Sequence, residues 1–204
     1  MTARRNRGVP RAWSGFLCVP VALFFALPQA AAQPRGDALV RSLDEVARVA
    51  SIMLDGDVCR RIVSKAVTDQ LFTRHPRDPW IGSDNYNVNQ AAFIQIKKTL
   101  LRLGRLAPLT YDVNLWMPIE GRPGKVHLVI RNANEISQFW TWGSMHQDAH
   151  PSMSQVLASG TRVTVSEKPG MVSILTPVFD SMGDVVAIAE VAARRQAAPR
   201  ENVK

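Results

Sequence analysis

The chain has very little cysteine. Its 204 residues include two cysteines, Cys18 and Cys59, and Cys18 lies in an N-terminal segment that we expect to be removed. No intramolecular disulfide is then possible, and Cys59 remains as a single thiol. Because Cys59 lies on the flank of an expected helix beside Val58 and Ile62, we interpret it as a buried apolar side chain. A reactive thiol, or one that pairs with another chain, is the alternative.

Several motifs of enzymes and nucleotide-binding proteins are also missing. The chain contains no Gly-x-Ser-x-Gly sequence and no glycine-rich phosphate loop, which argues against a serine hydrolase of that type and against a phosphate-loop site. Asp55-Gly56-Asp57 lacks the further acidic positions and the distal Glu of a calcium loop, so it predicts a helix break with caps. Lys and Arg do not gather with aromatic residues, so nucleic acid is not an expected partner.

No apolar run in the N-terminal region reaches the roughly 20 residues that cross a bilayer. Gly15–Leu27 follows four arginines and precedes Ala30-Ala31-Ala32, which is the pattern of a signal peptide. We therefore expect residues 1–32 to be cleaved and the protein to be periplasmic or secreted, or membrane-anchored if cleavage does not occur. Removing four arginines and no acid from a formal net charge of +8 leaves +4, a mildly basic mature chain.

Helical periodicity dominates the first half of the mature chain. Apolar residues recur at three- and four-residue spacing from Ala38 to Phe72, and this region is interrupted near residues 54–57. A loop over 75–89 precedes a helix that ends at Leu106. Its basic side carries Lys97, Lys98, Arg102 and Arg105. That side could meet lipid head groups or an acidic partner, and an ordinary solvated face is the alternative.

The pattern of the second half predicts β-strands. β-branched residues bounded by Gly, Pro, Asp and Ser are typical of antiparallel hairpins. The expected strands are Thr110–Ile119, Lys125–Asn132, Arg162–Glu167, Met171–Asp180 and Val185–Ala192. Alternation in the second strand predicts that one of its faces is buried. A long excursion, residues 133–160, separates the second and third strands and contains a short helix after Pro151. The fold class is therefore α+β with a five-stranded antiparallel sheet.

The last three strands carry a family resemblance. A helix that ends at Gly160 is followed by Val163-Thr164-Val165 and then by a run from Val172 to Ala187 that includes Pro177-Val178-Phe179-Asp180-Ser181-x-Gly183-x-Val185-Val186. This succession resembles the end of Cache domains, which are PAS-like sensor modules found outside the bacterial cytoplasm. The resemblance implies a single Cache-like domain over residues 88–193, preceded by a helical region and loop over 33–87 and followed by a flexible tail over 194–204.

The same resemblance implies where a ligand would bind. In Cache domains the ligand lies against the sheet, under the segment that joins the second and third strands, which here includes Phe139–His150. Apolar walls with a few polar groups are usual in such pockets, and Arg131 could pair with a carboxylate. The candidate ligand-binding residues are Asn114, Trp116, Arg131, Trp140, Trp142, His146 and Ser173. The alternatives are core packing for the two tryptophans and a solvated strand face for Arg131.

Three functions remain open on this basis. The first is an extracytoplasmic sensor domain that binds a small organic ligand, possibly a carboxylate, and acts through a signalling partner protein, with a homodimer through Ala38–Phe72 as a further possibility. The second is a metal-dependent enzyme, because His146 and His150 are four residues apart and imidazoles at that spacing on a helix can share a metal. The third is a pure protein-interaction module with a filled sheet face. We expect no cofactor and no resident metal.

Overall fold

The computed structural model describes residues 36–72, 88–141 and 146–195. The chain divides into residues 1–30 and residues 31–204, and everything described here belongs to the second unit. The expected signal peptide, the candidate ligand residue Trp142 and residues 196–204 of the expected tail lie outside the described residues.

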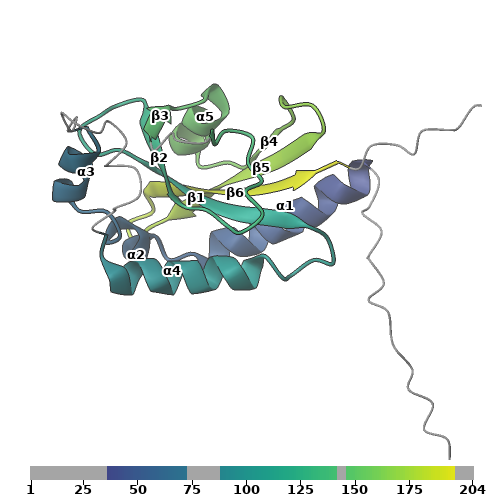
Figure 1. The fold of residues 1–204 in the computed structure, drawn as a ribbon, viewed down its shortest axis with the longest axis horizontal. Coiled ribbons are helices and arrows are strands. Elements are labelled where there is room, and N and C mark those ends of the chain that lie inside the picture. Colours follow the sequence, from purple (N-terminus) through teal and green to yellow (C-terminus); the bar gives the residue numbers. More distant parts are fainter. Residues whose placement is uncertain (1–35, 73–87, 142–145, 196–204) are drawn as a thin grey trace, which may run out of the picture. The chain divides into compact units, whose positions relative to one another are not determined.

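The second unit is built on one antiparallel sheet, so the α+β class is confirmed (Figure 1). The sheet has six strands in the order β3-β2-β1-β6-β5-β4. The strands are β1 (Tyr111–Pro118), β2 (Lys125–Ile130), β3 (His146–Asp148), β4 (Val163–Val165), β5 (Met171–Phe179) and β6 (Val185–Arg194). Five strands were expected, and the extra one is β3. It forms because His146–Asp148 pairs along the outer edge of β2.

The predicted helix break at residues 54–57 is confirmed. Helix α1 (Gly36–Met53) stops there, and α2 (Gly56–Arg60) starts with Asp55, whose side chain accepts a hydrogen bond from the Val58 amide. Satisfying a free amide at a helix start is the ordinary role of such a cap. The expectation of one further helical stretch to Phe72 was too simple. Ser64 accepts a bond from the Val67 amide at the start of α3 (Lys65–Leu71), so the stretch is two short helices.

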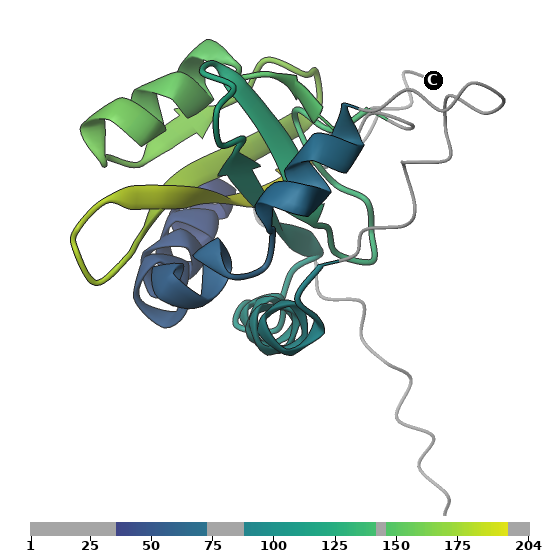
Figure 2. The same ribbon diagram turned by 90° about the vertical axis from the view of Figure 1, so that its left-hand side faces the viewer.

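One face of the sheet packs on α1 and α4 (Gln90–Leu103). Helix α4 begins at the predicted place, where Asn89 caps it by accepting from the Ala92 amide. The apolar side of α1 is buried in this core, and Figure 2 shows α1, α2 and α4 on the same side of the sheet. The core includes Leu39, Leu43, Ala47, Ile96, Leu100, Val113, Leu115, Val172, Ile174 and Val178.

The other face of the sheet is also covered. Helix α5 (Pro151–Ser159) and the segment 132–141, called here the covering segment, lie over it, and a second core forms around Trp116, Met153 and Val156. The strand β2 is buried from Val126 to Ile130. The prediction that only one of its faces is buried was therefore wrong, because the alternation of residue types does not reveal a second cover.

Within the described ranges, none of the helices combines the length and the apolar character that crossing a membrane requires.

Candidate functional site

A buried carboxylate lies at the centre of the sheet face that α5 and the covering segment cover, called here the covered face. Glu190 is in the middle of β6, a central strand that pairs with β1 and β5, and its exposed fraction is 0%. Its cross-strand neighbours are Asn114 on β1 and Leu175 on β5. Because side chains alternate along a strand, Glu190 points to the covered face while Ala189 and Val191 point into the core under α1.

Five groups donate hydrogen bonds to this carboxylate. Oε2 accepts from the Trp116 indole at 2.9 Å, from the Ser137 hydroxyl at 2.6 Å and from the Asn114 amide at 3.4 Å. Oε1 accepts from the Gln138 backbone amide at 2.7 Å and from the Ser173 hydroxyl at 2.9 Å. We call Glu190 with these five donors the Glu190 site.

The donors satisfy the carboxylate as water would. An ionised carboxylate only accepts hydrogen bonds, at about four lone-pair positions, and the Glu190 site fills them. Within the described part of the chain no Lys, Arg or His forms an ion pair with Glu190. Neutral, fixed dipoles therefore offset the cost of burying this charge, which would otherwise be several kcal/mol.

A second buried carboxylate holds the start of the covering segment. Asp112, on β1, accepts from the Asn134 backbone amide at 3.4 Å, from the Asn134 side chain at 2.9 Å and from the Ile136 amide at 2.8 Å. Asn114 adds two contacts, because it accepts from the Asn132 amide and donates to the Ile136 carbonyl. The polar row on β1 therefore fixes the backbone of the covering segment.

The covering segment is also tied to the β4–β5 hairpin. The Gln138 side chain donates to the Val165 carbonyl at 3.4 Å and accepts from the Lys168 amide at 2.9 Å. The Lys168 ammonium reaches the Ser137 carbonyl at 3.2 Å and the Trp140 carbonyl at 3.5 Å. The segment is thus bound to β1, β6 and the hairpin together.

Three of the predicted ligand residues meet in one place, and they meet Glu190. Asn114, Trp116 and Ser173 all donate to its carboxylate. The carboxylate chemistry expected of a ligand is therefore present in the site, and the chain itself supplies the carboxylate.

Two other predicted ligand residues lie apart from the Glu190 site. The Arg131 guanidinium stacks over the Trp140 ring at 4.5 Å and forms an ion pair with Glu135 at 3.1 Å. The Arg131 side chain is 45% exposed, so it lies at the rim of the covered face. This position fits the alternative interpretation, in which Arg131 lies on a solvated strand face.

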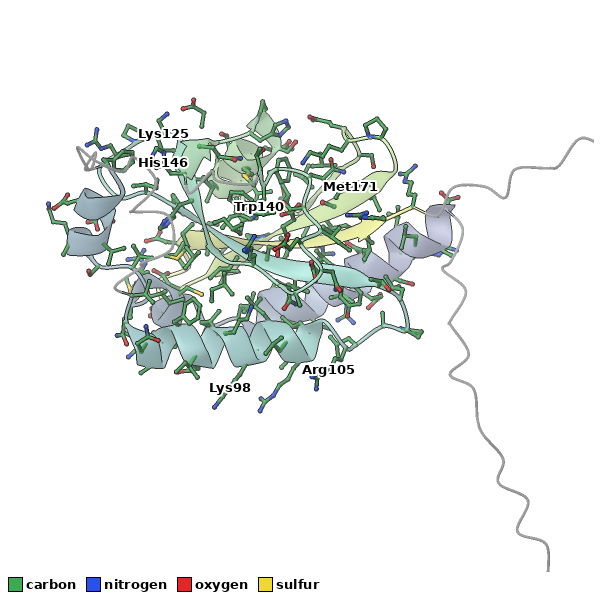
Figure 3. All side chains as sticks on the ribbon, in the orientation of Figure 1. Lys98, Arg105, Lys125, Trp140, His146 and Met171 are labelled. Atoms are coloured by element: carbon green, nitrogen blue, oxygen red, sulfur yellow. The ribbon has the colours of Figure 1, made fainter. Side chains whose placement is uncertain are left out.

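The two histidines considered for a metal do not share a helix face. His146 lies in the edge strand β3, where its ring stacks on Phe72 at 4.5 Å and Figure 3 shows it close to Lys125. His150 caps α5 by accepting from the Ser152 amide, and its other ring nitrogen contacts Glu167 at 2.9 Å. The helical spacing argument therefore fails, because residues 146–148 are extended. Among the described residues no group of three or more His, Cys, Asp or Glu is arranged to hold a metal ion.

Two further titratable groups are deeply buried in the structure. Burial raises the pKa of the Cys59 thiol to about 12, with a smaller contribution from the nearby Asp55 carboxylate. This agrees with the interpretation of Cys59 as an apolar core residue. Burial, with a smaller contribution from the neighbouring His146, lowers the pKa of His127 to about 4. His127 is therefore neutral at physiological pH.

The central residue of the site was missed in the sequence. Glu190 is the one charged residue within the apolar run Val185–Ala193, and a single Glu in an apolar, buried run must find donors. That signal was available. Ser137 and Gln138 gave no comparable signal, since polar residues in a long excursion are ordinary.

Comparisons with known proteins found no matching family model, no matching curated protein and no matching solved structure.

Proposed function

We propose that this chain is an exported, Cache-like binding module that acts through a partner protein, and that its covered sheet face is filled by its own carboxylate. The Glu190 site carries the proposal. Asn114, Trp116 and Ser173, the sheet residues suited to a ligand carboxylate, already donate to Glu190. A ligand at that position would have to displace a side chain from the middle of a paired strand.

The order of elements supports a PAS-like sheet. A long helix precedes the sheet, two hairpin strands and a long excursion follow, and three more strands complete it. In this interpretation β3 is an additional edge strand and the other five are the Cache strands. The export part of the proposal rests on the basic, apolar and small-residue succession of residues 1–32.

An exposed apolar surface supports contact with another protein. Ile52 and Met53, at the end of α1, are 74% and 45% exposed, and Phe179 and Met182, at the β5–β6 turn, are 40% and 84% exposed. The two places adjoin, because the backbone at Gly56 lies directly against the Phe179 backbone, while the Phe179 ring lies against Gly160. We call Ile52, Met53 and Met182 the apolar end. Clustered exposed apolar side chains commonly mark interaction sites.

Ion pairs and hydrogen bonds hold the apolar end in place. Asp57 accepts from the Ser181 amide and hydroxyl at 3.2–3.4 Å. Arg60 pairs with Asp180 at 2.8 Å and with Asp184 at 3.5 Å. The turn between β5 and β6 is therefore fixed on α2, so that a partner would meet a preformed surface.

Site-specific photo-crosslinking tests the proposal. A benzophenone amino acid is placed at Met182 or Ile52 in the full chain, produced in its own host, and at the exposed polar positions Glu120 and Gln155 as matched controls. We expect a discrete adduct from the first pair and none from the controls. An adduct of twice the chain's mass would identify the partner as a second copy. Equal labelling at all four positions, or no adduct at the apolar end, would contradict the proposal.

The outward side of α1, rather than its apolar side, is left for any homodimer. Leu39, Leu43, Val46, Ala47 and Ala50 are buried against the sheet of the same chain. A dimer through the 38–72 region would therefore use residues such as Arg41, Arg48 and Ile52, which point away from the core.

A small-ligand sensor is the second candidate, and the Arg131–Trp140 pair favours it. A half-exposed cation stacked on an indole offers both a charge and an apolar wall to an organic acid. A thermal-shift screen of the full chain against organic acids, amino acids and purines tests this candidate, because a ligand that binds only the folded state raises Tm. A shift that is lost in Trp140→Ala would make the sensor the better assignment. If no compound raises Tm, the interaction module remains the better assignment.

A further inference from the structure

Helix α4 carries positive charge on its solvent side and contains no acidic residue. Lys98, Arg102 and Arg105 are exposed, and Figure 3 shows Lys98 and Arg105 projecting away from the sheet. Within the described part of the chain, no carboxylate forms an ion pair with any of the three. This face therefore presents uncompensated charge.

Apolar side chains are exposed within the same face. Ile94 is 47% exposed and Leu101 is 40% exposed. They are two turns apart, and Lys98 lies between them at i+4 from Ile94, so all three share one side of the helix. Together with Arg102, and with Arg105 two residues beyond the end of α4, they form what we call the α4 stripe. Ordinary solvated helix faces are polar all along, so this mixture of cations and aliphatic residues needs another explanation.

The neighbouring Lys97 shows that the stripe is distinct from the cations that serve the fold. The Lys97 ammonium donates to the Arg131 carbonyl at 2.5 Å, and burial lowers its pKa. Lys97 thus ties α4 to the end of β2. Lys98 and Arg105 project away from the sheet (Figure 3), and among the described residues no side-chain hydrogen bond or ion pair holds the cations of the stripe.

We propose that the α4 stripe docks on an anionic bilayer surface. Cations that alternate with aliphatic residues suit a lipid surface, because the charges meet the head groups while Ile94 and Leu101 enter the layer below them. Helix α4 lies on the outside of the helical layer (Figure 2), and Lys98 and Arg105 project away from the sheet (Figure 3), so this side can contact a flat surface.

Vesicle co-sedimentation of the full chain tests this inference. The vesicles are phosphatidylcholine alone and phosphatidylcholine mixed with phosphatidylglycerol. Each cation near an anionic surface strengthens partitioning roughly fivefold. Replacing all three stripe cations (Lys98→Gln, Arg102→Gln, Arg105→Gln) is therefore expected to weaken binding to the anionic vesicles about 100-fold. Added salt is expected to weaken the parent protein's binding in the same direction.

A matched control removes three exposed cations elsewhere: Arg41→Gln, Arg61→Gln and Lys65→Gln. It has the same net charge as the stripe variant and the same N-terminal segment, so it is expected to bind nearly as the parent protein does. Equal losses in the two variants, or equal binding to neutral and anionic vesicles, would overturn the proposal. So would a stripe variant that keeps vesicle binding but loses binding to polyglutamate, because the occupant would then be an acidic protein. None of these results depends on cross-linking at the apolar end.

Discussion

Replacing Glu190 by Gln is the most direct test of the Glu190 site. The change keeps the shape of the side chain and removes its charge. One carboxylate oxygen becomes an amide nitrogen, which must face donors. If the nitrogen takes the place of Oε1, it meets the Gln138 amide, which is 2.7 Å away. If it takes the place of Oε2, it meets the Trp116 indole and the Asn114 amide. None of these three groups can accept a hydrogen bond from it.

The magnitude follows from the cheaper orientation. Ser173 can rotate its hydroxyl to accept, so the main loss is the Gln138 amide, and a buried donor without a partner costs about 1–3 kcal/mol. The remaining bonds also weaken, because bonds to an ionised acceptor are roughly twice as strong as neutral ones. Relief from burying a charge offsets part of this. We expect a net loss of about 3 kcal/mol in the free energy of unfolding, which for a domain of this size lowers Tm by about 6–12 °C.

Urea and thermal unfolding of Glu190→Gln and of a control, Glu135→Gln, measure the effect. Glu135 is half exposed and pairs with Arg131 at the surface, so its replacement should change stability by about 0.5 kcal/mol or less. A Glu190→Gln protein as stable as its parent, or more stable, would refute the reasoning. It would mean that the burial cost of the charge outweighs its five hydrogen bonds.

Three further perturbations have expected outcomes. A Cβ at Gly56 would lie 2.3 Å from the Phe179 carbonyl oxygen, so Gly56→Ala should destabilise by about 3 kcal/mol, more than Gly124→Ala, where nothing lies within 4 Å and only the left-handed backbone (φ +74°) opposes a side chain. The pKa of His127 is lowered from 6.5 to about 4. Its neutral form therefore contributes stability that is fully present above pH 6.5 and is lost as the pH falls toward 4. We expect the free energy of unfolding of His127→Leu to fall less steeply than that of the parent protein between pH 6.5 and 4. Cys59, whose pKa is raised to about 12, should resist iodoacetamide in the folded Cys18→Ser protein at neutral pH and react once urea unfolds it; rapid labelling of the folded protein would contradict its buried position.

Local signals in the sequence predicted most of the fold. Asp55, Asn89 and Pro151 mark helix starts through cap chemistry that depends on neighbouring residues alone. The turn residues between β5 and β6 bound those strands in the same way. The strand β3 was missed because a short edge strand is defined by its partner, β2, and its own three residues show no strand pattern.

The site was harder to predict because it depends on contacts far apart in the chain. Asn114, Trp116 and Ser173 were selected as polar positions on one sheet face, and the structure brings them together. What the sequence does not show is that β6 lies between β1 and β5 and therefore places Glu190 among them. Strand order in a sheet comes from long-range pairing, which no local pattern in β6 encodes.

If the donors of the Glu190 site are complementary to a carboxylate, a free carboxylate should bind when the side chain is shortened. Glu190→Ala removes the acceptor and leaves the five donors, from Asn114, Trp116, Ser137, Gln138 and Ser173, around a small cavity. Formate is the smallest carboxylate that could fill it. By mass action, formate at ten times its Kd would stabilise this variant by about 1.4 kcal/mol. We expect formate to raise the Tm of Glu190→Ala and to leave the parent protein unchanged, with chloride at equal ionic strength as the control. Equal effects of formate and chloride on the variant would show that the cavity collapses, and that Glu190 itself holds the donors in place.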